Sequence, residues 1–137
     1  RRTGRRHVED WRGACIFTAR TYLENLARTL AAAAGWEYSR DEAMRVGRRI
    51  GAIFRAFNLR CGIGNELERP SRRYGSTPTD GPGKGQSIEK HWDRMLDVWY
   101  EGMGYDRASG RPKPETLRSL DLEWMVPAVW GEERSRR

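Results

Sequence analysis

Asp10, Gly13 and Cys15 place a carboxylate, a glycine and a thiol directly before the first long helical pattern of the chain. Unpaired backbone N–H groups at a helix start lower the pKa of a thiol and favour the thiolate, which ligates iron or attacks electrophiles. Cys15 is therefore a candidate iron ligand or nucleophile. A lone cysteine before an apolar run is more often a small buried side chain, and this alternative stays open.

Four helical segments are predicted to position these residues. The first runs over Cys15–Ala34, where apolar residues recur at three- and four-residue steps and Gly35 supplies a left-handed stop. The second begins after Ser39, which has capping-box spacing to Glu42, and ends near residues 58–62. Its apolar positions are Met44, Val46, Ile50, Ile53, Phe54 and Phe57, and Gly47 and Gly51 offer a place where another helix can approach closely.

The third predicted helix is capped by Ser87, and the fourth is opened by Pro114, with Leu117 and Leu120 facing inward. The expected buried face of the third helix is Ile88, Trp92, Met95, Leu96, Trp99 and Met103. An apolar segment follows the fourth helix and would be exposed unless it folds back or meets a partner; its members are Trp124, Met125, Val126, Val129 and Trp130. No hairpin signal or internal repeat is present, so the predicted fold class is all-α.

Residues 62–86 are rich in glycine and proline and are predicted to form a long loop. Within it, residues 81–86 superficially resemble a phosphate-binding loop. The pattern fails because the first glycine is missing and Gly85 replaces the Ser or Thr that would follow Lys84 to bind Mg²⁺. We therefore interpret residues 81–86 as a turn.

The net charge of +7 on 137 residues invites a nucleic-acid interpretation, but most of it lies at the ends. Residues 1–6 contribute +4 and residues 132–137 contribute +1, which leaves +2 for the rest of the chain. Solvated tails are favoured over a polybasic binding arm, so a nucleic-acid partner is not expected. We divide the chain into a basic segment 1–8, a helical domain 9–131 and a charged tail 132–137.

Cysteine usage and hydropathy indicate the compartment. Cys15 and Cys61 cannot form a disulfide framework of the secreted kind, and no apolar run reaches the ~20 residues that a bilayer requires. No signal peptide is evident. A cytoplasmic protein without a membrane partner is the expectation.

Three passages resemble the C-terminal region of the aldehyde ferredoxin oxidoreductase family, the tungsten- or molybdenum-pterin enzymes, over residues 9–122. Asp10–Cys15 is similar to the family motif D-x-x-G-L-C, with Ala14 in place of Leu. Residues 57–62 are similar to F-N-x-R-E-G, with Cys61 in place of Glu. Residues 80–85, with the helix that follows them and the segment through Leu120, are similar to the closing part of the family pattern.

The resemblance implies roles for three residues. Cys15 would be the fourth cysteine ligand of a [4Fe–4S] cluster, Asp10 would accept hydrogen bonds from the pterin, and Gly13 would let the backbone approach that cofactor. Cys61 has no role in the family pattern and is interpreted as a buried thiol, with a second ligand as the less favoured option. No other catalytic residue is assigned.

The implied activity is oxidation of aldehydes to carboxylic acids with ferredoxin as the electron acceptor. The family's other three cluster cysteines and its metal-binding domain lie upstream, so a two-cysteine chain requires an upstream domain or a separate subunit to be active. We expect the chain to be a C-terminal piece of such an enzyme, a separately encoded portion of it, or an inactive remnant. Two alternatives remain: part of a related aromatic-thioester reductase of the benzoyl-CoA type, or a basic helical nucleic-acid-binding module.

Overall fold

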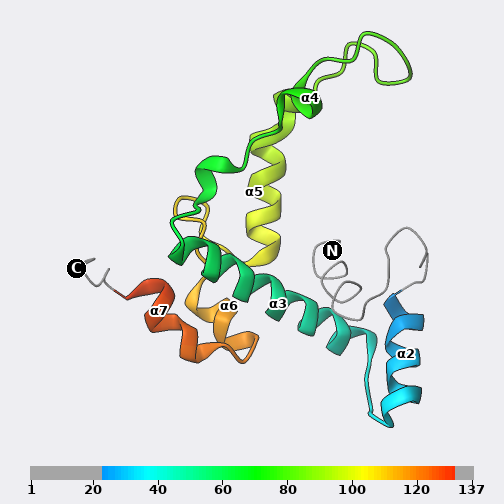
Figure 1. The fold of residues 1–137 in the computed structure, drawn as a ribbon, viewed down its shortest axis with the longest axis vertical. Coiled ribbons are helices and arrows are strands. Elements are labelled where there is room, and N and C mark those ends of the chain that lie inside the picture. Colours follow the sequence, from blue (N-terminus) through cyan, green and yellow to red (C-terminus); the bar gives the residue numbers. More distant parts are fainter. Residues whose placement is uncertain (1–22, 132–137) are drawn as a thin grey trace.

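The computed structural model describes residues 23–131, and all of its regular elements are helical (Figure 1). The all-α prediction is confirmed; within this range the β pairing is limited to an isolated bridge between Tyr105 and Pro112. No helix of the described range is long and apolar enough to cross a bilayer. The elements are α2 (Leu23–Ala34), α3 (Arg40–Arg60), η1 (Asn65–Leu67), α4 (Arg72–Gly75), η2 (Ile88–His91), α5 (Trp92–Met103), α6 (Pro114–Ser119), η3 (Glu123–Met125) and α7 (Val126–Trp130).

Helix α3 is the axis of the molecule: α2 lies beside its first turns, α6 and α7 lie along it, and α5 leads away from it (Figure 1). The predicted cap is confirmed, since the backbone N–H of Glu42 donates to the Ser39 hydroxyl at 3.1 Å. The predicted stop of the first helix is also confirmed, because Gly35 adopts the left-handed conformation at φ 69°. The part of that first helix before Leu23 lies outside the described residues.

Two groups of buried side chains hold the described helices together. The larger packs Ala52 and Ala56 of α3 against the C-terminal elements, which contribute Leu117, Leu120, Leu122, Met125 and Val129. The smaller packs α2 on α3 and consists of Leu23, Leu26, Ala27 and Ala43. Small residues on α3 permit these close approaches. Of the two glycines expected to offer such a place, Gly47 is buried and Gly51 is half-buried. Leu117 and Leu120 face inward as predicted.

The expected buried face of the third helix is partly wrong. Ser87 does accept from the N–H of Glu89, but the first turn is 3₁₀ and the α-helix begins at Trp92. Met95 is 48% exposed and Ile88 is exposed, whereas Tyr100, which was not expected inside, is 1% exposed. The reason is that α5 leads away from α3, so only its C-terminal turns reach the core (Figure 1).

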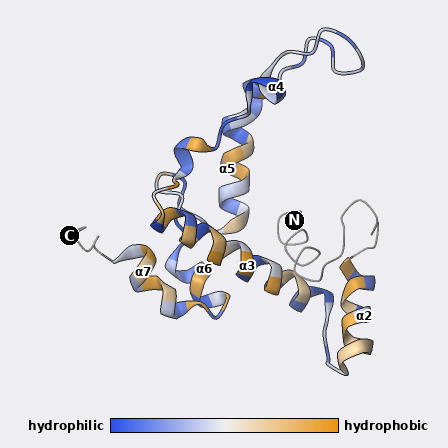
Figure 2. Ribbon diagram, in the orientation of Figure 1, coloured by the Kyte–Doolittle hydropathy of each residue, from blue (hydrophilic) through white to orange (hydrophobic). Residues whose placement is uncertain are grey.

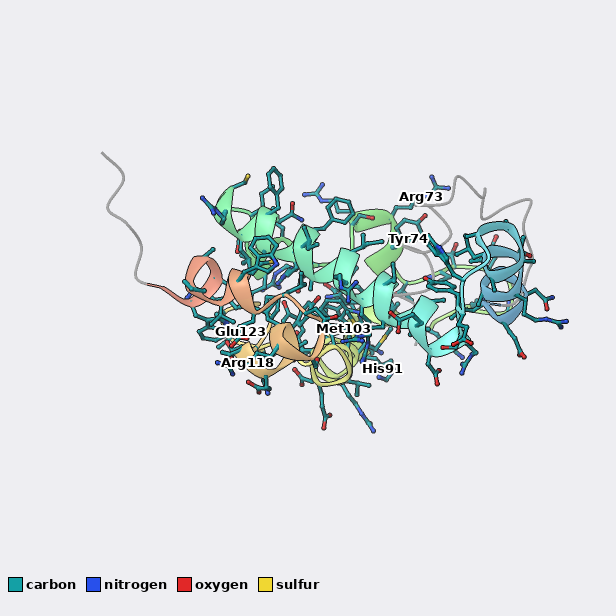
Figure 3. All side chains as sticks on the ribbon, turned by 90° about the horizontal axis from the view of Figure 1, so that it is seen from below. Arg73, Tyr74, His91, Met103, Arg118 and Glu123 are labelled. Carbon is teal, nitrogen blue, oxygen red and sulfur yellow. The ribbon has the colours of Figure 1, made fainter. Side chains whose placement is uncertain are left out.

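The apolar segment after α6 folds back onto α3, although its Trp124 remains 71% exposed. Met125 and Val129 are buried, and the Trp130 Nε1 donates to the Pro112 carbonyl at 2.8 Å. At the turn between α6 and η3, Arg118 Nε lies 3.3 Å from Glu123 Oε1 (Figure 3). The segment therefore supplies core to the same domain.

The span 62–86 differs from the predicted uninterrupted loop, because η1 and α4 interrupt it. Beyond α4 the chain projects away from the body (Figure 1). Its tip is a turn, as predicted: Gly85 N donates to Pro78 O at 3.0 Å and Lys84 N to Gly81 O at 3.1 Å. Gly81 and Gly85 both have positive φ, which a turn of this kind requires.

Candidate functional site

The residues that the sequence nominates for cofactor and metal binding, Asp10, Gly13 and Cys15, lie outside the described residues. The described part of helix α2 starts at Leu23, eight residues after Cys15 in the sequence. Leu23, Leu26 and Ala27 are buried against Ala43 of α3. The segment that follows the nominated site is therefore anchored on the longest helix of the domain.

Cys61 is exposed, so its interpretation as a buried thiol is wrong. It ends α3, where its backbone N–H donates to the carbonyls of Phe57 and Asn58, both at 3.0 Å. Among residues 23–131 no group of three His, Cys, Asp or Glu side chains is placed to hold a metal ion. Cys61 therefore belongs to no such group of three within residues 23–131.

A network of charged and aromatic groups, Arg55, Glu68 and Tyr100, lies where α3, the segment after η1 and α5 meet. Arg55 Nη1 forms an ion pair with Glu68 Oε1, and Arg55 Nη2 donates to the Tyr100 hydroxyl at 2.7 Å. The Tyr100 hydroxyl donates to Glu68 Oε2 at 2.6 Å. The side chains of Arg55 and Glu68 are only 12% and 23% exposed, so this is a largely desolvated ion pair.

Backbone groups complete this Arg55 network. Arg55 Nε donates to the Gly110 carbonyl at 2.7 Å, and the Trp92 Nε1 donates to the Glu68 carbonyl at 2.7 Å. Gly110 is required here, because its φ is +71° and a Cβ would overlap Arg55 Nη2. The network thereby joins α3, α5, the segment after η1 and the turn that carries Gly110.

The phenols of this region are poor acid–base catalysts at neutral pH. Burial and the hydrogen bond to Glu68 raise the pKa of Tyr100 to about 12. Burial also raises the pKa of Tyr105 to about 12, and no partner for its buried hydroxyl is found among the described residues. Both groups stay protonated near pH 7, which favours a positioning role for the Arg55 network.

A second set of arginines binds the N-terminal half of α3 to the turn after α6. Arg45 Nη2 contacts both carboxylate oxygens of Asp121 at 2.9 Å, and Arg49 Nη2 contacts Asp121 Oδ2 at 2.5 Å. Arg49 Nε also donates to the Leu120 carbonyl at 2.8 Å. These contacts hold the C-terminal elements on α3. They also pair the two arginine charges with the Asp121 carboxylate.

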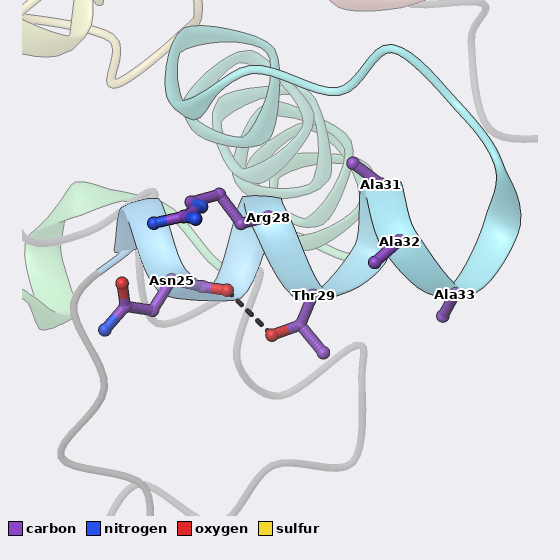
Figure 4. A pocket seen from close by; sticks show the side chains of 6 residues that line it. All are labelled: Asn25, Arg28, Thr29, Ala31, Ala32 and Ala33. Carbon is purple, nitrogen blue, oxygen red and sulfur yellow. Dashed lines mark hydrogen bonds between the residues drawn. The ribbon is translucent and has the colours of Figure 1, made fainter.

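Two open hollows lie on the surface of the described helices. One runs along α2 and is lined by Asn25, Arg28, Thr29, Ala31, Ala32 and Ala33 (Figure 4). In it, the Thr29 hydroxyl donates a hydrogen bond to the Asn25 carbonyl at 2.8 Å. The other lies on α5 and is lined by His91, Arg94, Met95 and Val98. Neither contains a carboxylate or a thiol, so neither offers the donors that a catalytic metal centre needs.

The comparisons with known proteins identify the class of domain. Residues 3–122 match the family model described as "Aldehyde ferredoxin oxidoreductase, domains 2 & 3", which spans both Asp10–Cys15 and the Arg55 network. The chain is thus a helical domain of an oxidoreductase. It belongs to the aldehyde ferredoxin oxidoreductase family and corresponds to the C-terminal region of its members.

Two curated relatives are tungsten-containing aldehyde ferredoxin oxidoreductases. The chain is 34% identical over 119 residues to the protein of Pyrococcus horikoshii and 32% identical over 120 residues to that of Pyrococcus abyssi. Each alignment covers 85% of this chain but 19% of the relative. The chain therefore spans about a fifth of the length of these enzymes.

A solved structure shares the fold. The active-site complex BamBC of benzoyl coenzyme A reductase, determined with 1,5-dienoyl-CoA, superimposes with a TM-score of 0.60. The match covers 77% of this chain and 15% of that one at 24% sequence identity. At this level the likeness establishes the helical architecture.

Proposed function

We propose that this chain is the C-terminal portion of a tungsten- or molybdenum-pterin, iron–sulfur oxidoreductase that oxidises aldehydes to carboxylic acids and passes the electrons to ferredoxin. The observation that carries the proposal is the family match over residues 3–122, which includes Asp10–Cys15. The names of the relatives supply the substrate class, the metal and the electron acceptor.

In this proposal Cys15 provides one thiolate of a [4Fe–4S] cluster, and Asp10 accepts hydrogen bonds from pterin N–H groups. Gly13 leaves room for the backbone to lie against the cofactor. When bound, the pterin-held metal would supply the redox chemistry and the cluster would supply electron transfer. The chain's own contribution in this proposal is a carboxylate and a thiolate five positions apart in the sequence.

The cysteines of this chain can supply only part of the ligand set of a [4Fe–4S] cluster. The sequence contains two cysteines, and Cys61 is exposed at the C-terminal end of α3, whereas α2 packs near the N-terminal end of that helix. A four-cysteine cluster therefore needs ligands from outside this chain. Because the relatives are about five times as long, the remaining ligands are assigned to the part of the enzyme that this chain does not span.

The test uses Cys15→Ser, with Cys61→Ser as the matched control, in the chain assembled with the preceding part of the enzyme. Iron and acid-labile sulfide per assembled enzyme are expected to fall sharply in Cys15→Ser, since a cluster ligand is lost. They are expected to stay at the wild-type level in Cys61→Ser. Full iron and sulfide in Cys15→Ser would refute the assignment.

A substrate assay tests the activity. Reduction of ferredoxin with an aldehyde is the expected result for the assembled enzyme. The alternative, a reductase acting on an aromatic CoA thioester, predicts turnover of that thioester and no aldehyde-dependent reduction. The shared fold favours neither substrate, so the assay must include both.

A further inference from the structure

The positive charge of the described residues is concentrated in one segment. Residues 69–94, which we call the basic arm, contain six Lys or Arg residues and three Asp or Glu residues, a net charge of +3. Residues 23–131 as a whole carry +2, so the described residues outside the basic arm are slightly acidic. The cations of the basic arm are all exposed; they are Arg69, Arg72, Arg73, Lys84, Lys90 and Arg94.

These six cations have no partners within the part of the chain that the structure describes. None of their side chains forms a hydrogen bond or an ion pair with residues 23–131. Five arginines outside the basic arm are each paired with a carboxylate, namely Arg45, Arg49, Arg55, Arg107 and Arg118. Because unpaired charge is costly to bury, the basic arm has the character of a surface that meets solvent or an oppositely charged partner.

Two contacts hold the outgoing and returning legs of the basic arm together. The Trp92 Nε1 donates to the Glu68 carbonyl at 2.7 Å, and the Ser87 hydroxyl donates to the Gly75 carbonyl at 3.0 Å. Helix α4 of the outgoing leg also contacts η2 of the returning leg. The cations of both legs are thereby brought to the same end of the molecule, which projects away from α3 (Figure 1) and is hydrophilic at α4 (Figure 2).

The composition of the basic arm favours a protein partner over a nucleic acid. Tyr74, which is 77% exposed, follows Arg72 and Arg73, and Tyr and Arg are enriched at the residues that dominate the energy of protein interfaces. The carboxylates of Asp80 and Glu89 lie among the cations in the sequence. A phosphate backbone would be repelled by these carboxylates, whereas an acidic protein face can offer groups complementary to both signs of charge.

We propose that the basic arm attracts and docks ferredoxin, the electron acceptor of the proposed function, on which this inference rests. A cluster core held by four cysteine thiolates carries net negative charge, and reduction adds an electron, so ferredoxin supplies the charge that the basic arm lacks. Encounters between redox proteins use small interfaces and are accelerated by complementary charge. In this proposal the basic arm raises the rate of encounter with ferredoxin, and the electron leaves the enzyme elsewhere.

The test measures the KM for ferredoxin of the assembled enzyme with an aldehyde as the electron donor. The double variant Arg72→Glu/Arg73→Glu is expected to raise this KM by about tenfold, because two attractive charges become repulsive. The charge-retaining variant Arg72→Lys/Arg73→Lys is expected to stay within about twofold of wild type, since steering depends on charge more than on side-chain geometry. Added salt is expected to raise the KM of the wild type and to change that of the charge-reversed variant less.

The matched control is Arg28→Glu/Arg60→Glu, which changes the net charge equally at two exposed arginines outside the basic arm. Its KM for ferredoxin is expected to stay within about twofold of wild type. Benzyl viologen, a small acceptor that needs no docking surface, reports whether each variant is assembled and active. A KM for ferredoxin that is unchanged in Arg72→Glu/Arg73→Glu, or that rises equally in the control, overturns the proposal.

Other occupants of the basic arm give different results. A nucleic-acid partner would leave the KM for ferredoxin unchanged in the charge-reversed variant, which overturns the proposal. If the rest of the enzyme covers the basic arm, Arg72→Glu/Arg73→Glu would lose assembly and activity with benzyl viologen while the control keeps both, and this result also overturns it.

The two proposals fail separately. Absence of aldehyde-dependent reduction of either acceptor by the assembled wild-type enzyme would refute the proposed function. Aldehyde-dependent reduction of both acceptors, with a KM for ferredoxin that does not respond to Arg72→Glu/Arg73→Glu, would refute the role of the basic arm and leave the proposed function standing.

Discussion

Replacing Glu68 with alanine tests whether the Arg55 network holds the domain together. The change removes the ion pair with Arg55 and the acceptor of the Tyr100 hydroxyl, and it leaves a guanidinium in a site only 12% exposed. Breaking a fully buried pair costs about 3–5 kcal/mol. The residual exposure of both partners lowers the estimate to about 3 kcal/mol of the free energy of unfolding.

Urea unfolding followed by circular dichroism measures this loss. With a slope of about 2 kcal/mol/M, typical for a chain of this size, the midpoint is expected to fall by about 1.5 M. Glu68→Gln retains an acceptor oxygen and loses only the charge, so an intermediate fall is expected.

Glu123→Ala is the control, because Glu123 also pairs with an arginine, Arg118 at 3.3 Å, but is 75% exposed. A surface pair contributes about 0.5 kcal/mol or less, so the midpoint should move by less than about 0.3 M. Similar shifts for Glu68→Ala and Glu123→Ala would refute the reasoning that burial makes the Arg55 network strong.

Two further predictions concern the same region. Gly110→Ala is expected to lower the free energy of unfolding by about 2–3 kcal/mol in urea unfolding, because the new Cβ displaces Arg55 and the residue must keep a positive φ. The control is Gly85→Ala, at φ +76° in open space, which is expected to cost about 1 kcal/mol. Equal costs for the two variants would contradict this prediction. Tyr105→Phe is expected to stabilise the protein by about 1 kcal/mol at pH 7, since the buried hydroxyl has no partner among the described residues. The pKa of Tyr105 is raised from 10.0 to about 12, so between these pH values the native state keeps a proton that the unfolded state loses. The free energy of unfolding therefore falls between pH 10 and 12. An equal fall in Tyr105→Phe and in the wild type would contradict this prediction.

Local signals in the sequence predicted the helices well. The hydroxyl of Ser39, the left-handed Gly35 and the N-terminal Pro114 are short-range features, and each acts where it was expected. Periodicity also predicted that Leu117 and Leu120 face inward. Such signals depend on neighbours within four residues, so they do not depend on the tertiary contacts of the helix.

Burial was predicted less well because it depends on which elements meet. Periodicity places Met95 and Trp99 of α5 on one side, but a helix that leads away from the core leaves Met95 48% exposed and buries Tyr100. The Arg55 network joins residues 13, 32 and 45 positions apart, and no spacing rule links them. The candidate site at Asp10–Cys15 was predicted from a motif and lies outside the described residues.

Cys61 and Phe57 are both exposed near the C-terminal end of α3. A buried thiol was expected because cysteines are usually inside, yet Cys61 is the C-cap residue of α3 and is exposed. Apolar periodicity thus identifies the apolar faces of α3, but the burial of each residue depends on which elements meet those faces in the tertiary fold.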